Sequence, residues 1–171
     1  EDAAATLDLV RPIPFHTNHE ITPGIDLRLS RAGHILGAAS VRLRFDAADA
    51  SVGFSGDLGR GTHPFLLAPD APPPGVDTLL VESTYGDRRH VDDDANERLA
   101  EIISTTIGRG GSVLIPAFAV DRTEVILVHL ARLAADGRLP GGVPVYVDSP
   151  MALAALGVET GFFEELAVVK H

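Results

Sequence analysis

Four residues combine reactive chemistry with positions that suit a catalytic or metal-binding site. Asp57, Glu82 and Asp148 each follow a short, largely apolar segment that is typical of a β-strand, and His34 lies in a glycine-bounded turn. In α/β proteins the carboxyl ends of strands face the ligand crevice, so side chains at these positions can meet there. Imidazole nitrogen and carboxylate oxygen both bind zinc, but a zinc site needs about four ligands. Spacing alone therefore indicates only a candidate site, and ordinary turn residues have the same pattern.

The strands expected to hold these residues lie first in the amino-terminal half. Residues 25–30 and 41–45 alternate apolar and polar side chains, as half-buried strands do, and residues 51–54 form a third short strand. His34 lies between the first two strands, and Asp57 follows the third. We therefore expect a partial mixed sheet, built largely in antiparallel style, up to about residue 86.

Strands and helices alternate in the second half. The expected strands are residues 78–82, 112–116 and 143–147, and the expected helices are residues 94–108, residues 121–136 and a segment that begins at Pro150. Asp121 with Glu124 three residues later is typical of a capping box, and Ser149 fits the N-cap of the last helix. Apolar strands that alternate with helices predict a parallel sheet covered on both faces. The change of pattern indicates a module boundary near residues 86–92.

The composition limits the classes of protein that fit. The 171 residues carry 14 basic and 24 acidic side chains, a formal net charge of −10. This charge counts against a broad basic surface for nucleic acid, but it allows one basic groove or bound cations. No apolar run approaches the roughly 18–20 residues of a membrane span. The sequence has no cysteine, which excludes disulfides and thiolate zinc sites and fits the cytoplasmic location that we expect.

Five sequence strings, in this order and at these separations, carry a specific resemblance. They are AGHILGAA at 32–39, FSGDLGR at 54–60, VESTYGDR at 81–88, GGSVLIPAFAVDRTE at 110–124 and VDSPMA at 147–152. Together they resemble the β-CASP branch of the metallo-β-lactamase-fold nucleases, which includes ribonuclease J-like enzymes and the endonuclease that cuts eukaryotic pre-mRNA 3′ ends. The resemblance implies an α/β chain: part of a metallo-β-lactamase αββα sandwich over residues 1–88, joined to part of a parallel α/β β-CASP domain over residues 89–171.

The resemblance also implies roles for individual residues. His34 resembles the metal-binding histidine of the family's third motif, and Asp57 resembles the aspartate that bridges two zinc ions. Glu82 resembles the acidic residue that opens the β-CASP cassette, which lies beside the zinc ions without binding them. Arg122 and Ser149 are candidate contacts to the substrate, with a surface salt bridge and a helix cap as their ordinary alternatives.

Departures from the family pattern limit what the chain contains. The sequence lacks the His-x-His-x-Asp-His string that supplies most zinc ligands in the family, and it lacks the later cassette motifs with their histidines. The segment HTNH has a different form, so we expect neither His16 nor His19 to bind the catalytic metal. Asp121 stands where we expect glycine. We interpret the chain as a fragment of a longer enzyme, inactive by itself.

The predicted activity is zinc-dependent hydrolysis of RNA phosphodiester bonds in RNA processing or degradation. In the complete enzyme, two zinc ions would lower the pKa of a bound water towards about 7 and stabilise the displacement at phosphorus. The resemblance favours single-stranded RNA as the substrate, and a homodimer is a further expectation. The alternatives are a DNA nuclease of the same branch, another metallo-β-lactamase-fold hydrolase and a non-catalytic scaffold subunit. Retention of His34 and Asp57 counts against the scaffold.

Overall fold

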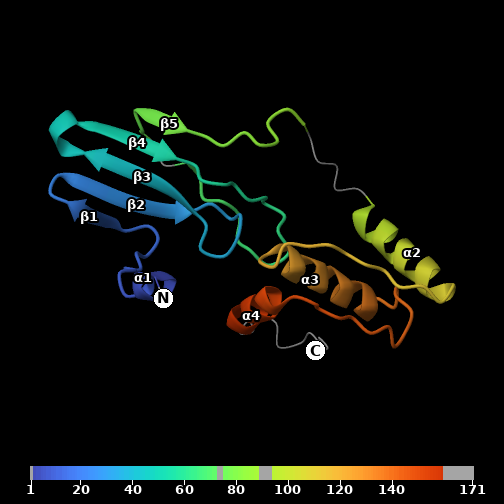
Figure 1. The fold of residues 1–171 in the computed structure, drawn as a ribbon. Coiled ribbons are helices and arrows are strands. Elements are labelled where there is room, and N and C mark those ends of the chain that lie inside the picture. Colours follow the sequence, from blue (N-terminus) through green and yellow to red (C-terminus); the bar gives the residue numbers. More distant parts are fainter. Residues whose placement is uncertain (1, 73–74, 89–93, 160–171) are drawn as a thin grey trace. The chain divides into compact units, whose positions relative to one another are not determined.

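The computed structural model describes residues 2–72, 75–88 and 94–159 of the chain. Two compact units are present, Glu1–Asp87 and Arg88–His171, and each has its own set of elements (Figure 1). Among the described residues, no helix combines the length and the apolar character that crossing a membrane requires.

The first unit is built on a five-stranded sheet whose strands follow one another in chain order (Figure 1). The strands are β1 (Asn18–Thr22), β2 (Ile25–Arg31), β3 (Ala39–Phe45), β4 (Ala50–Phe54) and β5 (Thr78–Leu80). The first four are antiparallel neighbours, and β5 pairs with β4 in parallel. The predicted mixed sheet is confirmed; β1 and two short helices, α1 (Asp2–Leu7) and the 3-10 helix η1 (Asp46–Ala48), were not predicted.

The strand register explains the alternating pattern of the sequence. Leu27 lies opposite Leu43 on one face of the sheet, and the next pair along, Arg28 and Arg42, projects from the other face because strand side chains alternate. Every residue of β2 and β3 is half-buried. The sheet therefore has an apolar face and a polar face, and the loops that follow β2 and β4 carry the candidate site.

The described part of the second unit contains three helices, α2 (Ala95–Gly108), α3 (Arg122–Ala135) and α4 (Pro150–Glu159). All three were predicted from the sequence, with bounds that agree to within about a residue at their starts. Each contributes two apolar side chains that are buried: Ala100 and Ile103, Leu127 and Leu133, and Ala152 and Leu156. Burial of these side chains stabilises the helices, since most helical stability in proteins comes from the packing of apolar side chains.

The predicted parallel sheet of the second half is not formed by the described residues. Residues 112–116 form no strand, and within residues 143–147 only Tyr146 makes an isolated β-bridge. A strand needs neighbours that pair its backbone groups and cover its apolar faces. Leu114, within residues 112–116, is 93% exposed, and Phe118, just beyond them, is 84% exposed. The apolar pattern therefore identifies residues that are suited to a buried strand. It does not determine whether a neighbouring strand is there to pair with them.

Candidate metal centre

His34 and Asp57 lie on two loops that contact each other. His34 follows β2, and Asp57 follows β4. The backbone N–H of Gly59 donates a hydrogen bond of 2.8 Å to the carbonyl oxygen of Ala32. A Cβ atom on Gly59 would lie 1.6 Å from the carbonyl oxygen of Gly33, so only glycine permits this approach. Gly59 is two residues from Asp57, and Ala32 is two residues from His34. Because consecutive Cα atoms are about 3.8 Å apart, this contact places both candidate ligands at the same end of the sheet.

The side chains of His34 and Asp57 are exposed and available to a ligand. Neither forms a hydrogen bond or ion pair with another described residue. Their donor atoms, imidazole nitrogen and carboxylate oxygen, suit zinc. However, no group of three or more His, Asp or Glu side chains within the described ranges is arranged to hold a metal ion. The described residues therefore fit zinc in type but supply only part of a site.

Glu82, two residues beyond β5, connects its own loop to the Asp57 loop. Its Oε2 accepts a hydrogen bond of 3.1 Å from the backbone N–H of Thr84, and its Oε1 accepts one of 3.1 Å from that of Leu58. These two bonds, with a smaller contribution from the nearby His34, hold the pKa of Glu82 below its ordinary value. The carboxylate is therefore ionised at neutral pH, and both of its oxygens are engaged by backbone donors.

Two serines that sequence reasoning missed complete this support. The Oγ of Ser55 accepts a hydrogen bond of 2.9 Å from the backbone N–H of Glu82 and donates one of 2.7 Å to the carbonyl of Gly56. The Oγ of Ser40 donates a hydrogen bond of 2.7 Å to the carbonyl of Ser55. Ser55 is buried. Serine is common in turns, so its type and spacing did not distinguish Ser55 from an ordinary loop residue.

Arg122 opens α3 in the second unit, where its side chain is exposed. The capping box predicted for this helix is wrong: Asp121 makes no side-chain cap hydrogen bond, and its φ is 68°. An N-cap residue normally has a β-region backbone, whereas positive φ favours glycine, the residue expected at this position. The first turn is held instead by the hydroxyl of Thr123, which donates a hydrogen bond of 2.8 Å to the carbonyl of Phe118.

Glu124, the other member of the predicted capping box, is fully buried. Neither of its carboxylate oxygens has a hydrogen-bond partner of ordinary geometry among the described residues. Burial raises the pKa of this carboxyl group, and the charge of Asp121 acts in the same direction; backbone groups of Asp121 and Glu124 offset only part of the effect. The second unit therefore holds an acid in surroundings that disfavour its charged form.

Ser149 is the N-cap of α4, as predicted. Its Oγ accepts a hydrogen bond of 3.2 Å from the backbone N–H of Ala152, and its carbonyl accepts one of 3.0 Å from Leu153. Asp148, immediately before it, is exposed. The hydroxyl of Ser149 thus has a structural partner, and a contact of Ser149 or Arg122 with substrate stays a prediction.

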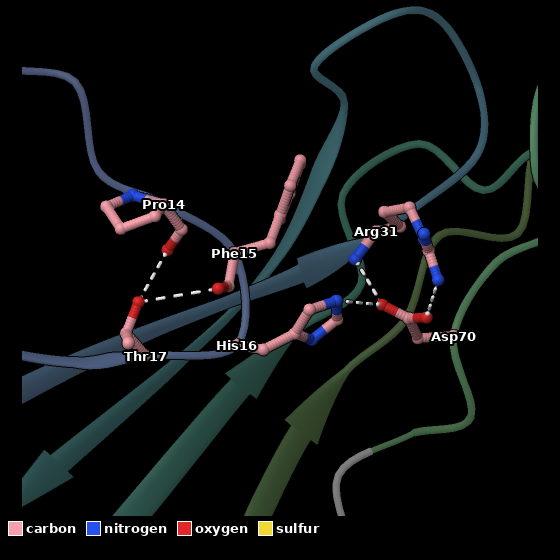
Figure 2. Close-up of polar contacts among 6 residues, drawn as sticks. All are labelled: Pro14, Phe15, His16, Thr17, Arg31 and Asp70. Atoms are coloured by element: carbon pink, nitrogen blue, oxygen red, sulfur yellow. Dashed lines mark hydrogen bonds and ion pairs between the residues drawn. The ribbon is translucent and has the colours of Figure 1, made fainter.

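His16 contacts Asp70 and is far in sequence from Asp57 and Glu82. Its Nε2 lies 3.5 Å from Oδ2 of Asp70, whose Oδ1 lies 2.9 Å from Nη2 of Arg31 (Figure 2). The backbone N–H of Arg31 also donates a hydrogen bond of 2.7 Å to Asp70, and this bond is the main reason why the pKa of Asp70 is lowered. The cluster fastens the segment before β1 and the segment around Asp70 to the end of β2.

Comparison with known proteins gives homologues over most of the chain. No family model matches. The RNase J-like protein of Methanocaldococcus jannaschii is 33% identical over 154 residues, or 88% of this chain. The transcription termination factor FttA of Pyrococcus horikoshii is 37% identical over 151 residues, or 86% of the chain. The endoribonuclease YSH1 of Kluyveromyces lactis is 33% identical over 162 residues, or 92% of the chain.

These relatives and the five strings agree on the class of protein: the chain belongs to the β-CASP branch of the metallo-β-lactamase fold. Its relatives within that class include RNase J-like, FttA and YSH1 proteins. The chain spans 36%, 23% and 21% of the lengths of the three relatives named above. It therefore corresponds to one portion of each of them.

Proposed function

We propose that this chain is part of a zinc-dependent ribonuclease that hydrolyses phosphodiester bonds of single-stranded RNA during RNA processing or degradation. The homology to RNase J-like and endoribonuclease proteins supports the reaction class. The observation that carries the proposal is the contact between the His34 loop and the Asp57 loop, which leaves both side chains free at one end of the sheet. The absence of cysteine supports a cytoplasmic location.

In this proposal, His34 and Asp57 hold zinc together with ligands contributed by residues beyond these 171. Zinc bound there would activate a water molecule at neutral pH and stabilise the charge that develops on the phosphate. Glu82 keeps the Asp57 loop in place through its bond to the backbone of Leu58. Residues 1–88 form the metallo-β-lactamase portion and residues 89–171 the first portion of the β-CASP domain, in which Arg122 and Ser149 face the RNA.

The test uses a protein that contains this chain and the remaining zinc ligands. Asp57→Ala should remove zinc and nearly all cleavage of labelled single-stranded RNA, because the carboxylate binds the metal directly. At saturating zinc, Glu82→Ala should lower turnover by about 10–100-fold while zinc content stays nearly unchanged, since this residue orients the loop without coordinating. The matched control is Asp46→Ala, which removes an exposed carboxylate from the β3–β4 connection and should change neither property.

The outcomes separate the alternatives. Near wild-type cleavage by Asp57→Ala would contradict the metal assignment. Loss of zinc from Glu82→Ala that excess zinc does not restore would make Glu82 a metal ligand. A wild-type protein that binds zinc but cleaves no nucleic acid would favour a scaffold subunit, and preferential cleavage of DNA would change only the substrate.

A further inference from the structure

Asp57 is held through the peptide groups on both of its sides. The carbonyl oxygen of the preceding peptide, on Gly56, accepts a hydrogen bond of 2.7 Å from the Oγ of Ser55. The N–H of the following peptide, on Leu58, donates a hydrogen bond of 3.1 Å to Oε1 of Glu82. Because each peptide group is planar, restraint of both planes restrains the direction of the Cα–Cβ bond of Asp57 between them.

The two restraints are joined through a single hydroxyl group. The backbone N–H of Glu82 donates a hydrogen bond of 2.9 Å to the same Ser55 Oγ that donates to Gly56. A serine hydroxyl has one donor and two acceptor sites, so it can make both bonds at once. The bonds form a closed ring that runs from Ser55 through Gly56, Asp57 and Leu58 to Glu82 and back to Ser55.

Ser55 itself is fixed by the strands on either side of β4. Its backbone N–H donates a hydrogen bond of 2.9 Å to the carbonyl of Leu80 in β5, and its carbonyl accepts one of 2.7 Å from the Oγ of Ser40 in β3. Only 8% of Ser55 is exposed. Loss of its hydroxyl would take away the partner that the N–H of the half-buried Glu82 and the carbonyl of the exposed Gly56 have in the structure.

The ring also stabilises an unusual turn. Gly56 has a φ of 58°, and a Cβ atom there would lie 2.7 Å from the carbonyl oxygen of Ala39. The chain therefore bends sharply immediately before Asp57, and the bond from Ser55 holds the peptide that follows the bend. The Asp57 carboxylate takes no part in the ring and stays exposed. The backbone is thus fixed, and the oxygen atoms remain free for a ligand.

We propose that Ser55 is a positioning residue that presents the Asp57 carboxylate to the metal through this hydrogen-bonded ring. The inference rests on the proposed function, in which Asp57 binds zinc. A loop already held in the binding geometry loses less conformational freedom when the metal binds, so its affinity is higher. Loss of an outer partner of a metal ligand typically costs 10–100-fold in metal affinity, and we expect about that loss here.

The experiment measures zinc affinity by competition with a chelator, in a protein that contains this chain and the remaining ligands. Ser55→Ala should bind zinc about 10–100-fold more weakly, and excess zinc should restore its turnover on RNA, because the chemistry itself is intact. Ser55→Thr keeps the hydroxyl and should stay near the wild-type affinity. The matched control is Ser30→Ala: Ser30 lies opposite Ser40 in the sheet, and its side chain makes no hydrogen bond with a described residue.

A second measurement keeps the inference testable in the 171-residue chain without metal. Amide hydrogen exchange at Leu58 and Glu82 should accelerate in Ser55→Ala, whereas exchange at Gly59, whose N–H is bonded to Ala32, should change less. If Ser55→Ala does not fold, Ser40→Ala replaces it and should show smaller changes in the same direction.

Wild-type zinc affinity in Ser55→Ala, or unchanged exchange at both amides, would overturn the inference. An equal loss of affinity in Ser55→Thr and Ser55→Ala would also overturn it, because the effect would then not depend on the hydroxyl. A wild-type protein that binds no zinc would instead overturn the proposed function and, with it, the metal-binding part of the inference.

Discussion

At the scale of single residues, the acids of this chain differ in what their oxygens contact. Asp57 has an exposed carboxylate without a partner among the described residues, whereas both oxygens of Glu82 accept backbone hydrogen bonds. Glu124 is the opposite case, because it is buried and neither oxygen has a hydrogen bond of ordinary geometry with a described residue. One acid is therefore available to a ligand, one holds a loop, and one is in surroundings that favour its protonated form.

Glu124 makes the stability of the chain depend on pH. Since the folded-state pKa is raised above the ordinary value of 4.5, the folded state keeps a proton that the unfolded state has lost in the range above 4.5. Its contribution to the free energy of unfolding is therefore fully present below that value and is lost as pH rises through the folded-state pKa. Glu124→Gln should be more stable than wild type at pH 7, because the amide carries no charge to bury.

Urea unfolding between pH 4 and pH 8 checks this prediction. The difference between Glu124→Gln and wild type should grow as pH rises. Glu101→Gln is the matched control, because Glu101 is exposed on α2, and it should match wild type throughout. A Glu124→Gln variant that is less stable than wild type at pH 7 would show that the ionised carboxylate has a partner that stabilises it.

At the scale of elements, the first residues of the helices show where N-cap preferences predict the structure correctly and where they do not. Ser149 caps α4 as predicted, whereas Asp121 does not cap α3, although both residue types are favoured N-caps. The difference lies in the backbone: Asp121 has a positive φ, which an N-cap residue does not normally adopt. In α2, the adjacent residues Ile102 and Ile103 differ in burial: Ile103 is buried but Ile102 is 53% exposed, although both side chains are apolar.

The cap on α4 has a measurable contribution to stability. Ser149→Ala should lower the free energy of unfolding by about 0.5–2 kcal/mol, because the N–H of Ala152 loses its acceptor. Ser149→Asp supplies another acceptor and should restore most of the loss. Thermal unfolding measures both variants. A loss of RNA affinity in Ser149→Ala without any loss of stability would assign Ser149 to substrate binding in place of capping.

At the scale of the whole molecule, the zinc site depends on more residues than the described part of the chain supplies. His34 and Asp57 give two ligands, and no group of three potential ligands is found among the described residues. The relatives are much longer than the stretch that this chain matches in them. The proposed activity therefore belongs to a longer protein, and the chain alone should behave as an incomplete site.

Calorimetric titration with zinc tests that expectation on the 171-residue chain. We expect weak binding, with a dissociation constant above the micromolar range, because catalytic zinc sites use about three protein ligands and structural ones four. Asp57→Ala should abolish what binding remains. Submicromolar binding that disappears in His16→Ala would show instead that the histidine beside Asp70 belongs to a metal site.

The sequence by itself determined the family, the positions of His34, Asp57 and Glu82, four strands of the first unit and the three helices of the second. These features depend on local periodicity and on motif strings, which one chain displays directly. It did not reveal β1, the burial of Ser55 and Glu124, or that residues 112–116 form no strand with the described part of the chain.

Only the tertiary structure decided those points, because each depends on groups far apart in the sequence. Whether a serine is a turn residue or the centre of a hydrogen-bonded ring depends on Glu82, which lies 27 positions beyond Ser55. Whether an apolar segment pairs as a strand depends on a neighbour elsewhere in the chain. Hydrogen bonding and burial are properties of the environment that folding creates, and residue types at fixed spacing do not specify that environment.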